Sequence, residues 1–554
     1  FRIYSSLWEY AGIEEVFSLI AACLAAAVAK IVIISFTWSV MPRSWYVLDT
    51  IYLMILIGAT RVSYRLIRLR RQNRTFPWSK RKKVMIIGGG EAGRSLITEI
   101  QNSKYLDQKV VCIIDDDPYK IGRYIKGVKV VGNRNNIKKS VKKYNVQQII
   151  LTMPSANAAK IRPIVEICQD TNCELMILPG VYQLVNGEVK ASKLRPVNID
   201  DLLGRDEVHV NLNEVMDYVS GRVIMVTGGG GSIGSELCRQ IAKHSPKQLI
   251  IFDIYENNAY DIQQELLREQ PKLDLVVLIG SVRDENRINS IFEQYRPEII
   301  YHAAAHKHVP LMEGSPNEAI KNNVLGTYNM VRMADKWNAK RFVQISTDKA
   351  VNPTNIMGAS KRICEMIIQT YNKESNTEYV AVRFGNVLGS NGSVIPLFKK
   401  QIAEGGPVTV THPEIIRYFM TIPEAVSLVL QAGAYAKGGE IFVLDMGEPV
   451  KILDLARNMI RLSGYKVDQD IKIEFTGLRP GEKLYEELLM DEEGMTDTPN
   501  KLIHIGHPID VDEVKLAHAL RVLESAAQNE TDDMRLIVES IVPTYHPKLN
   551  KSTQ

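Results

Sequence analysis

The chain opens with two long apolar segments. Residues 16–36 and 45–64 consist mainly of hydrophobic residues, with Lys30 inside the first and Asp49 near the start of the second. At about 20 residues each, both are long enough to cross the hydrocarbon core of a bilayer as a helix. This pattern predicts a transmembrane hairpin within residues 1–75. The alternative is a pair of helices buried in a soluble fold.

A basic segment follows the second apolar run. Residues 65–74 read RLIRLRRQNR, and such flanks favour the cytoplasmic side of a membrane. We therefore predict a multi-pass protein of the inner or plasma membrane, in contact with the lipid bilayer, whose remaining chain lies in the cytoplasm. The chain begins with Phe1 rather than methionine, so we expect further residues to precede it in the natural protein.

From Lys82 onward the pattern changes to short apolar strands that alternate with amphipathic helices. The segment KKVMIIGGGEAGRSLITEI predicts a strand, a glycine turn with the G-x-G-x-x-G spacing, and a helix. Residues 80–180 therefore form a first Rossmann-like domain with a doubly wound parallel sheet. Asp115, Asp116 and Asp117 end its second strand, where a ribose-binding carboxylate could stand. The turn could equally serve only close packing, and no acid–base cluster follows it.

A second strand–turn–helix pattern begins near residue 220. Residues 181–219 have mixed polarity and no sustained period, so we interpret them as a linker. Residues 220–500 repeat the alternation and predict a larger α/β domain with a substrate-capping region. Residues 501–554 predict a polar helical tail. The expected fold class is thus α/β, with two Rossmann-like doubly wound parallel sheets behind a helical hairpin.

Composition narrows the function classes. The formal net charge is only +5, which gives no indication of nucleic-acid binding. The six cysteines are scattered and lack the spacing of a metal site, so we expect them to be reduced and buried. The histidines of HAAAHKHV lack a carboxylate at ligand spacing, and we predict no metal.

The second α/β domain carries a dinucleotide-binding pattern. Gly228, Gly231 and Gly234 give the spacing that lets a backbone approach a pyrophosphate at a helix N-terminus. The strand QLIIFD ends in Asp253, where a carboxylate binds the adenosine ribose and repels a 2′-phosphate. This arrangement predicts NAD as the cofactor. Further cofactor contacts are expected from Ser232, Ile233, Ala303, Ala304 and Asp284.

Six long motifs resemble one family of enzymes. They are TGGGGSIGSE, HAAAHKHVPLME, ISTDKAVNPTNIMGASKR, RFGNVLGSNGSVIPLF, THPEIIRYFMT and GLRPGEKLYEEL. Together they resemble the extended short-chain dehydrogenase/reductase superfamily and, within it, the membrane-bound nucleotide-sugar 4,6-dehydratases of the CapD/PglF/WbpM type. The resemblance covers nearly all of the chain. Where that family usually has aspartate near the adenine, this chain has Ser281, with Asp284 close by.

The resemblance implies a reaction and a set of roles. The expected substrate is UDP-N-acetylglucosamine, which would lose water to give a 4-keto-6-deoxy sugar. Asp348 is then the general acid toward O6, Lys349 the base at C5, and Thr347 a hydrogen-bond partner of O4. Lys361 is expected to bind the nicotinamide ribose. Nucleotide-sugar contacts are expected from His306, Lys307, Asn386, Ser393, Arg417, Arg479 and Glu482.

Met357 stands where short-chain dehydrogenases have the tyrosine of a Tyr-x-x-x-Lys pair. A thioether cannot exchange a proton, so another group must deprotonate O4. Asp348, Lys349 and a water held by Thr347 all stay open as that group. Two other functions also stay open: a UDP-sugar 4-epimerase, and a non-catalytic membrane regulator that binds nucleotide sugar. We expect the protein to be a homo-oligomer.

Overall fold

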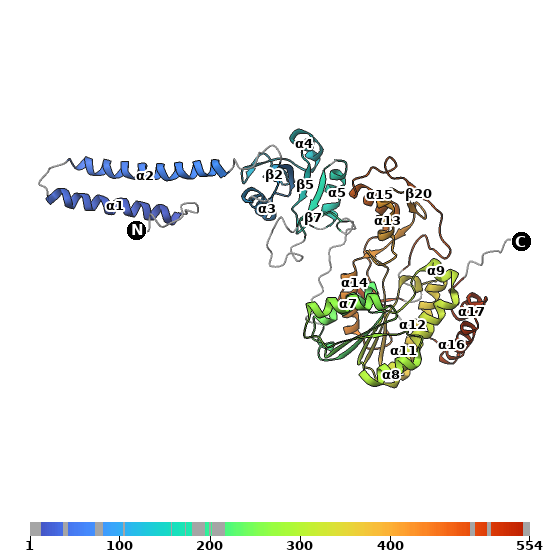
Figure 1. Ribbon diagram of the computed structural model, residues 1–554. Coiled ribbons are helices and arrows are strands. Elements are labelled where there is room, and N and C mark those ends of the chain that lie inside the picture. The colour runs from blue at the N-terminus through green and yellow to red at the C-terminus, as the bar shows by residue number, and fades with distance from the viewer. Residues whose placement is uncertain are drawn as a thin grey trace. The chain divides into compact units, whose positions relative to one another are not determined.

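The structure is a computed structural model that describes most of the chain (Figure 1). The described residues are 13–36, 42–72, 81–103, 106–156, 158–171, 173–179, 194–198, 201, 216–487, 494–506 and 511–546. Most of the predicted linker, residues 181–219, lies outside them, as do residues 37–41 between the two apolar segments.

The two apolar segments form helices. These are α1 (Ile13–Phe36) and α2 (Arg43–Gln72). Among the residues that the structure describes, however, no helix combines the length and the apolar character that a membrane span requires. The predicted transmembrane hairpin is therefore not supported. Lys30 of the first apolar run and Asp49 of the second form an ion pair of 2.5 Å.

The first α/β domain contains one sheet of seven strands. Its order is β3-β4-β2-β1-β5-β6-β7, and the pairs of β4 with β2, β1 with β5 and β5 with β6 are parallel. The apolar runs of the sequence fall on its central strands, which are buried on both faces. The strands are β1 (Lys82–Ile87), β2 (Gln108–Ile114), β3 (Tyr124–Ile125), β4 (Val128–Gly132), β5 (Gln148–Leu151), β6 (Glu174–Ile177) and β7 (Arg195–Pro196). The helices are α3 (Glu91–Asn102), α4 (Ile137–Tyr144) and α5 (Ala158–Gln169).

The second α/β domain is built on a sheet of nine strands. Its order is β10-β9-β8-β11-β12-β13-β18-β22-β21, and all pairs from β10 to β18 are parallel. The strands are β8 (Val223–Thr227), β9 (Gln248–Asp253), β10 (Leu275–Ile279), β11 (Ile299–His302), β12 (Arg341–Ile345), β13 (Glu378–Arg383), β18 (Ile441–Leu444), β21 (Met495–Asp497) and β22 (Ile503–Gly506). The order reverses between β8 and β11, and ligands of such sheets bind at this reversal, beyond the carboxyl ends of the strands. The predicted doubly wound fold class is confirmed for this domain.

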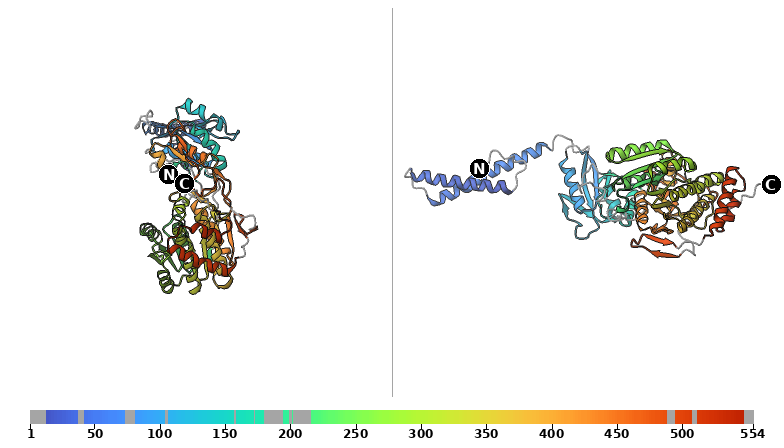
Figure 2. Two further views of the ribbon diagram at one scale, coloured as in Figure 1. Left: turned by 90° about the vertical axis from the view of Figure 1, so that its right-hand side faces the viewer. Right: turned by 90° about the horizontal axis from the view of Figure 1, so that it is seen from below.

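Helices cover both faces of the nine-stranded sheet because successive strand residues point to opposite sides. Met225 and Ile250 pack with one group of helices, whereas Ile224 and Ile251 pack with the other. The first group is α8 (Glu285–Tyr295), α11 (Gly326–Lys336) and α12 (Ile356–Glu374), and the second is α6 (Ser232–Ala242), α7 (Glu256–Glu269) and α14 (Ile422–Tyr435). The predicted tail supplies α16 (Glu513–Gln528) and α17 (Met534–Ile541), which lie side by side against the α11–α12 face (Figures 1 and 2).

A smaller region follows β13, in the part of the chain where we predict a substrate cap. It contains α13 (Val394–Ala403), α15 (Ile452–Leu462) and three pairs of short strands. The pairs are β14 (Asn386–Val387) with β17 (Phe419–Met420), β15 (Val408–Val410) with β20 (Ile473–Phe475), and β16 (Ile416–Arg417) with β19 (Val450–Lys451). Two short helices, α9 (Val309–Gly314) and α10 (Pro316–Ala319), follow β11.

Candidate active site

The glycine turn after β8 leaves no room for side chains. Gly228 has φ of +66°, a left-handed conformation that favours glycine. A Cβ on Gly234 would lie 2.0 Å from the carbonyl oxygen of Gly228, so the helix can pack against the turn only with glycine there. Helix α6 begins at Ser232, directly after this turn, and its first N–H groups have no partner within the helix. A bare turn beside such a helix start is suited to a pyrophosphate.

Asp253 lies beside this turn, at the carboxyl end of β9. One carboxylate oxygen, Oδ2, accepts a hydrogen bond from the Gly230 amide at 2.8 Å, and Oδ1 accepts one from Tyr255 at 2.9 Å. The side chain is therefore fixed next to the turn, where a dinucleotide presents its adenosine ribose. The turn, the helix start and this carboxylate fit NAD.

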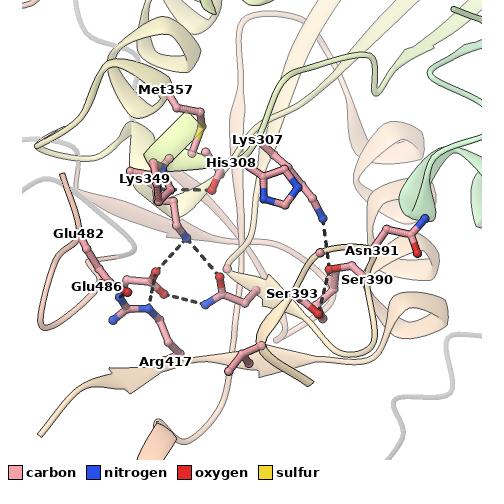
Figure 3. A pocket seen from close by; sticks show the side chains of 18 of the residues that line it. Lys307, His308, Lys349, Met357, Ser390, Asn391, Ser393, Arg417, Glu482 and Glu486 are labelled. Atoms are coloured by element: carbon pink, nitrogen blue, oxygen red, sulfur yellow. Dashed lines mark hydrogen bonds and ion pairs between the residues drawn. The ribbon is translucent and has the colours of Figure 1, made fainter. Parts of the chain in front are cut away.

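A cavity of about 740 Å³ is lined both by the glycine turn and by residues of the smaller region after β13. Figure 3 shows side chains that line it. It is lined by most of the residues that the sequence singled out. These are Gly228, Gly231, Ser232, Ile233, Gly234, Ala303, His306, Lys307, Thr347, Lys349, Met357, Lys361, Asn386, Ser393, Arg417, Arg479 and Glu482. Residues from distant segments thus meet around one space large enough for a dinucleotide end and a sugar nucleotide.

Asp348 is buried behind the cavity wall. Only 1% of the residue is exposed, and it is not among the lining residues. Its Oδ1 accepts hydrogen bonds from the Thr347 hydroxyl at 2.8 Å and from Lys349 Nζ at 3.0 Å, and both of those side chains line the cavity. Its Oδ2 is buried with no hydrogen-bond partner among the described residues. Burial, opposed by Lys349, raises the pKa of the Asp348 carboxyl to about 6.

Two carboxylates hold the Lys349 amine in its charged form. Burial acts to lower the pKa of its amine, but two carboxylates, Asp348 at 3.0 Å and Glu486 at 2.8 Å, outweigh it and raise that pKa above its usual value. At neutral pH the Asp348–Lys349 pair therefore holds one proton. The apparent pKa values belong to the pair, because its members interact strongly.

Glu486 is the site residue that the sequence interpretation missed. Its carboxylate lies beside Lys349, accepts a hydrogen bond from Asn386 Nδ2 at 2.9 Å and forms an ion pair with Arg417 Nε at 3.1 Å (Figure 3). It lines the cavity and is 8% exposed. The adjacent glutamates of the LYEEL segment are the only sign of it in the sequence, and they do not show which of the two points inward.

Met357 and Lys361 lie one turn apart on α12, near its start. Asn355 caps this helix by accepting from the Gly358 amide at 2.8 Å, and a Cβ on Gly358 would lie 2.1 Å from the Lys349 carbonyl oxygen. The cap and the close approach hold the first turn of α12 against the segment that carries Lys349. Both Met357 and Lys361 are buried and line the cavity. Burial lowers the pKa of the Lys361 amine.

The two arginines that we predict to contact the nucleotide sugar have different surroundings. The Arg417 guanidinium forms ion pairs with Glu486 and with Glu482, the latter at 3.4 Å. It also donates hydrogen bonds to the carbonyl oxygens of residues 416, 483 and 484. Arg479 is more open, with 55% of its side chain exposed, and it pairs with Glu482 at 3.1 Å. Of the two arginines, Arg479 is the better placed to meet a pyrophosphate.

A few predicted cofactor residues lie outside the cavity lining. Asp284 caps α8 by accepting from the Arg287 amide at 3.0 Å, and it is exposed. Asp253 bonds the amide of Gly230, which precedes the lining residue Gly231. Ala304 follows the lining residue Ala303 in the chain. His302 is buried between Thr227 and Thr327, where burial lowers the pKa of its imidazole to about 3. Its environment is that of a neutral core histidine.

The first α/β domain repeats the contact between an acid and a glycine turn. Asp115 Oδ2 accepts from the Gly89 amide at 2.6 Å and from Lys120 Nζ at 3.1 Å. Asp116 pairs with Arg134, and Asp117 with Lys120. No cluster of three or more His, Cys, Asp or Glu side chains suited to a metal ion occurs in the part of the chain that the structure describes.

The site and fold can be compared with known proteins. Residues 224–508 match the family described as "Polysaccharide biosynthesis protein", and residues 3–179 match a family described as "CoA-binding domain". The "Capsular polysaccharide biosynthesis protein CapD" of Staphylococcus aureus is 46% identical over 498 residues, which cover 89% of this chain and 82% of that protein. The chain belongs to the polysaccharide biosynthesis protein family. The predicted resemblance to the CapD type is thereby confirmed.

Two other similarities concern about half of the chain. A "UDP-glucose 4-epimerase" of Rickettsia bellii is 36% identical over 279 residues, 49% of this chain and 79% of that protein. The solved structure "Pen from Bacillus thuringiensis" is 35% identical, covers 52% of this chain and 90% of its own, and has a TM-score of 0.49. Family and relatives identify this polysaccharide biosynthesis protein as an enzyme that modifies nucleotide sugars.

The placement of Asp253 leads to a binding prediction. Asp253→Ala should weaken NAD binding about tenfold or more and reduce the preference for NAD over NADP. The variant loses both the carboxylate that accepts from the ribose and the charge that repels a 2′-phosphate. Calorimetric titration with each cofactor measures both effects. Asp261→Ala on the exposed side of α7 removes the same charge and should change neither. Unchanged affinity and preference in the Asp253 variant would show that another residue recognises the ribose.

Proposed function

We propose that this enzyme dehydrates UDP-N-acetylglucosamine to the UDP-linked 2-acetamido-2,6-dideoxy-hexos-4-ulose, using NAD, for the synthesis of a bacterial capsule, exopolysaccharide, O-antigen or protein glycan. The observation that carries the proposal is the Asp348–Lys349 pair, joined at 3.0 Å at the edge of a cavity that begins at the dinucleotide turn. Elimination needs an acid and a base side by side, and this pair supplies both.

The chemistry requires that one cofactor be used and restored. Bound NAD would accept a hydride from C4 of the sugar and return it to C6. In between, the C4 ketone makes the C5 proton acidic, and the C6 hydroxyl leaves as water. Lys361 at the α12 turn and the bare glycine turn would hold the cofactor beside the sugar. No external reductant is needed.

Asp348 and Lys349 can each be given a proton-transfer step such that all protons are accounted for. Proton transfer from Lys349 Nζ to Asp348 Oδ1 gives a neutral amine and a neutral carboxyl from the one proton that the pair holds. The amine takes the C5 proton. The Asp348 proton reaches O6 through the Thr347 hydroxyl, which bonds Oδ1 and lines the cavity. Lys349 then returns its proton to C5, and the pair regains one proton from solvent.

This balance also bears on the first step, the loss of the O4 proton. If the pair accepted that proton, it would hold two protons and would contain no base for C5. The acceptor therefore lies outside the pair, and of the groups that the sequence left open only a water held by Thr347 remains. This route does not need the tyrosine that Met357 replaces.

The mass of the product tests the proposal. Purified protein is incubated with UDP-N-acetylglucosamine, and the sugar nucleotide is followed by mass spectrometry. We expect the loss of one water and a C4 carbonyl that reacts with hydrazine reagents. An unchanged mass with inverted C4 would instead identify an epimerase, and an unaltered substrate would identify a binding protein. Location at a membrane stays a prediction of the sequence.

Met357 gives a second test, because the proposal makes the tyrosine unnecessary. Met357→Tyr should leave kcat unchanged or lower it, since the side chain is 3% exposed and overpacking a buried position costs about 1–3 kcal/mol. Met357→Leu keeps the volume without the sulfur and should retain the rate. A tenfold rise in kcat for the tyrosine variant, about 1.4 kcal/mol of barrier, would contradict the relocated proton chemistry.

A further inference from the structure

Glu486 lies in the cavity wall and contacts Lys349 directly. The proposed reaction nevertheless gives it no step. We propose that Glu486 is a positioning residue for the dehydration: its carboxylate fixes the Lys349 amine at the cavity and supplies the negative charge that keeps this amine protonated between turnovers. The inference rests on the proposed function and extends it to a residue that takes no part in proton transfer to the sugar.

The carboxylate of Glu486 is held in one position by its neighbours. Three side chains from separate segments converge on its carboxylate: Lys349 at 2.8 Å and Arg417 at 3.1 Å on Oε1, and Asn386 at 2.9 Å on Oε2. These partners come from the turn after β12, from β16 and from β14. A carboxylate tied at both oxygens has little freedom to turn, so it defines one place for the lysine nitrogen.

The Lys349 amine needs a group that fixes its position. A lysine side chain has a flexible four-carbon stem, and a base that works on a carbon acid must be held within reach of one proton. Asp348 at 3.0 Å, Glu486 at 2.8 Å and Asn386 Oδ1 at 3.3 Å fix its nitrogen from three sides. Asp348 is also a reacting group, whereas Glu486 keeps its charge throughout the cycle. Glu486 can therefore hold the amine in every step.

The charges around the pair also depend on Glu486. Five charged groups face one another here: Asp348, Lys349, Glu486, Arg417 and Glu482. Glu482 stands against the far side of Arg417 at 3.4 Å, so Glu486 is the anion that the pair meets directly. Its charge acts to raise the pKa of the Lys349 amine and that of the Asp348 carboxyl. Removing that charge should therefore lower both pKa values.

Three variants separate charge from position. Glu486→Gln removes the charge at nearly constant shape, and Glu486→Asp keeps the charge but shortens the side chain. Glu487→Gln is the matched control, because Glu487 is the exposed neighbour that bonds Asn352 at 2.9 Å and does not line the cavity. For each, kcat and KM are measured from about pH 5 to pH 10 by product formation, together with the thermal midpoint in the presence of NAD.

We expect kcat of Glu486→Gln to fall about tenfold or more while KM stays within about threefold, because the base is misplaced and the substrate site is kept. Both limbs of its pH profile should move to lower pH, by about half a unit or more. Glu486→Asp should lose kcat similarly but keep the limbs of the wild type. Glu487→Gln should match the wild type throughout. If Glu486→Gln does not fold, the loss of kcat at constant KM in Glu486→Asp decides the question.

Two results would overturn the inference. Wild-type limbs in a folded Glu486→Gln variant would show that its charge does not act on the pair. A raised KM with unchanged kcat in either variant would make Glu486 a substrate-binding residue. Failure of the proposed function is seen separately, because wild-type protein would then leave the mass of UDP-N-acetylglucosamine unchanged before any variant is made.

Discussion

Replacing Asp348 with asparagine should lower kcat about 10²–10⁴-fold and leave KM nearly unchanged, since this is the usual worth of a general acid. The amide keeps the shape of the carboxyl, and its oxygen can still accept from Thr347 and Lys349 as Oδ1 does now. What it cannot do is give up a proton to the leaving hydroxyl. The loss should therefore fall on elimination and spare the binding of substrate.

A single-turnover experiment locates the loss. With excess enzyme, the variant should still oxidise C4, so reduced cofactor should accumulate and be visible by its absorbance. Asp335→Asn on α11 makes the same change outside the cavity, where the carboxylate bonds Ser375, and should behave as wild type. Retention of a tenth or more of the wild-type kcat in Asp348→Asn would remove Asp348 from the acid role.

The pKa of Asp348 gives this prediction a pH dependence. Burial raises that pKa to about 6, so the carboxylate takes up a proton at a higher pH than an exposed aspartate does. Below that point the pair holds two protons and contains no base. The kcat/KM of the wild type should therefore fall as the pH drops through about 6, and the apparent value belongs to the coupled pair.

The cofactor half of the site could be predicted from the sequence because its chemistry is local. A strand, a glycine turn and a helix follow one another directly, and the acid ends the next strand, so spacing along the chain determines geometry in space. The structure places Gly228, Gly234 and Asp253 accordingly. The doubly wound sheet followed from the same alternation of strands and helices.

The substrate half was less predictable because its residues meet only through tertiary packing. Glu486 and Lys349 are in contact although they lie 137 positions apart in the chain, and the sequence around each gives no sign of the other. The same holds for Arg417, whose guanidinium is used by Glu482, Glu486 and backbone oxygens and is not open to a phosphate. The burial of Asp348 likewise depends on tertiary packing. Gly385 comes so close that a Cβ on it would lie 3.2 Å from Asp348 Oδ2.

Lys349 gives the second large effect and distinguishes the base from the acid. Lys349→Ala should lower kcat about 10²–10⁴-fold, because no other amine bonds Asp348 at the described cavity wall. It should also lower stability, since removing one partner of a buried ion pair typically costs about 3–5 kcal/mol and here leaves Asp348 and Glu486 facing each other. A thermal midpoint measured with NAD present shows whether the variant is folded at the assay temperature.

Exchange at C5 then separates the two roles. In deuterated water, Asp348→Asn should exchange the C5 proton of the oxidised sugar only once the pH is high enough to deprotonate Lys349, because the carboxylate that takes its proton is gone. Lys349→Ala should not exchange this proton at any pH. A small primary amine added to Lys349→Ala should restore part of the exchange, in proportion to its neutral form, because the truncated side chain leaves space at the cavity wall. Lys307→Ala is the control at the same cavity: as a predicted substrate contact it should raise KM and keep the exchange. Undiminished C5 exchange in Lys349→Ala would assign the base to another group, and the proton balance drawn for the pair would then be wrong.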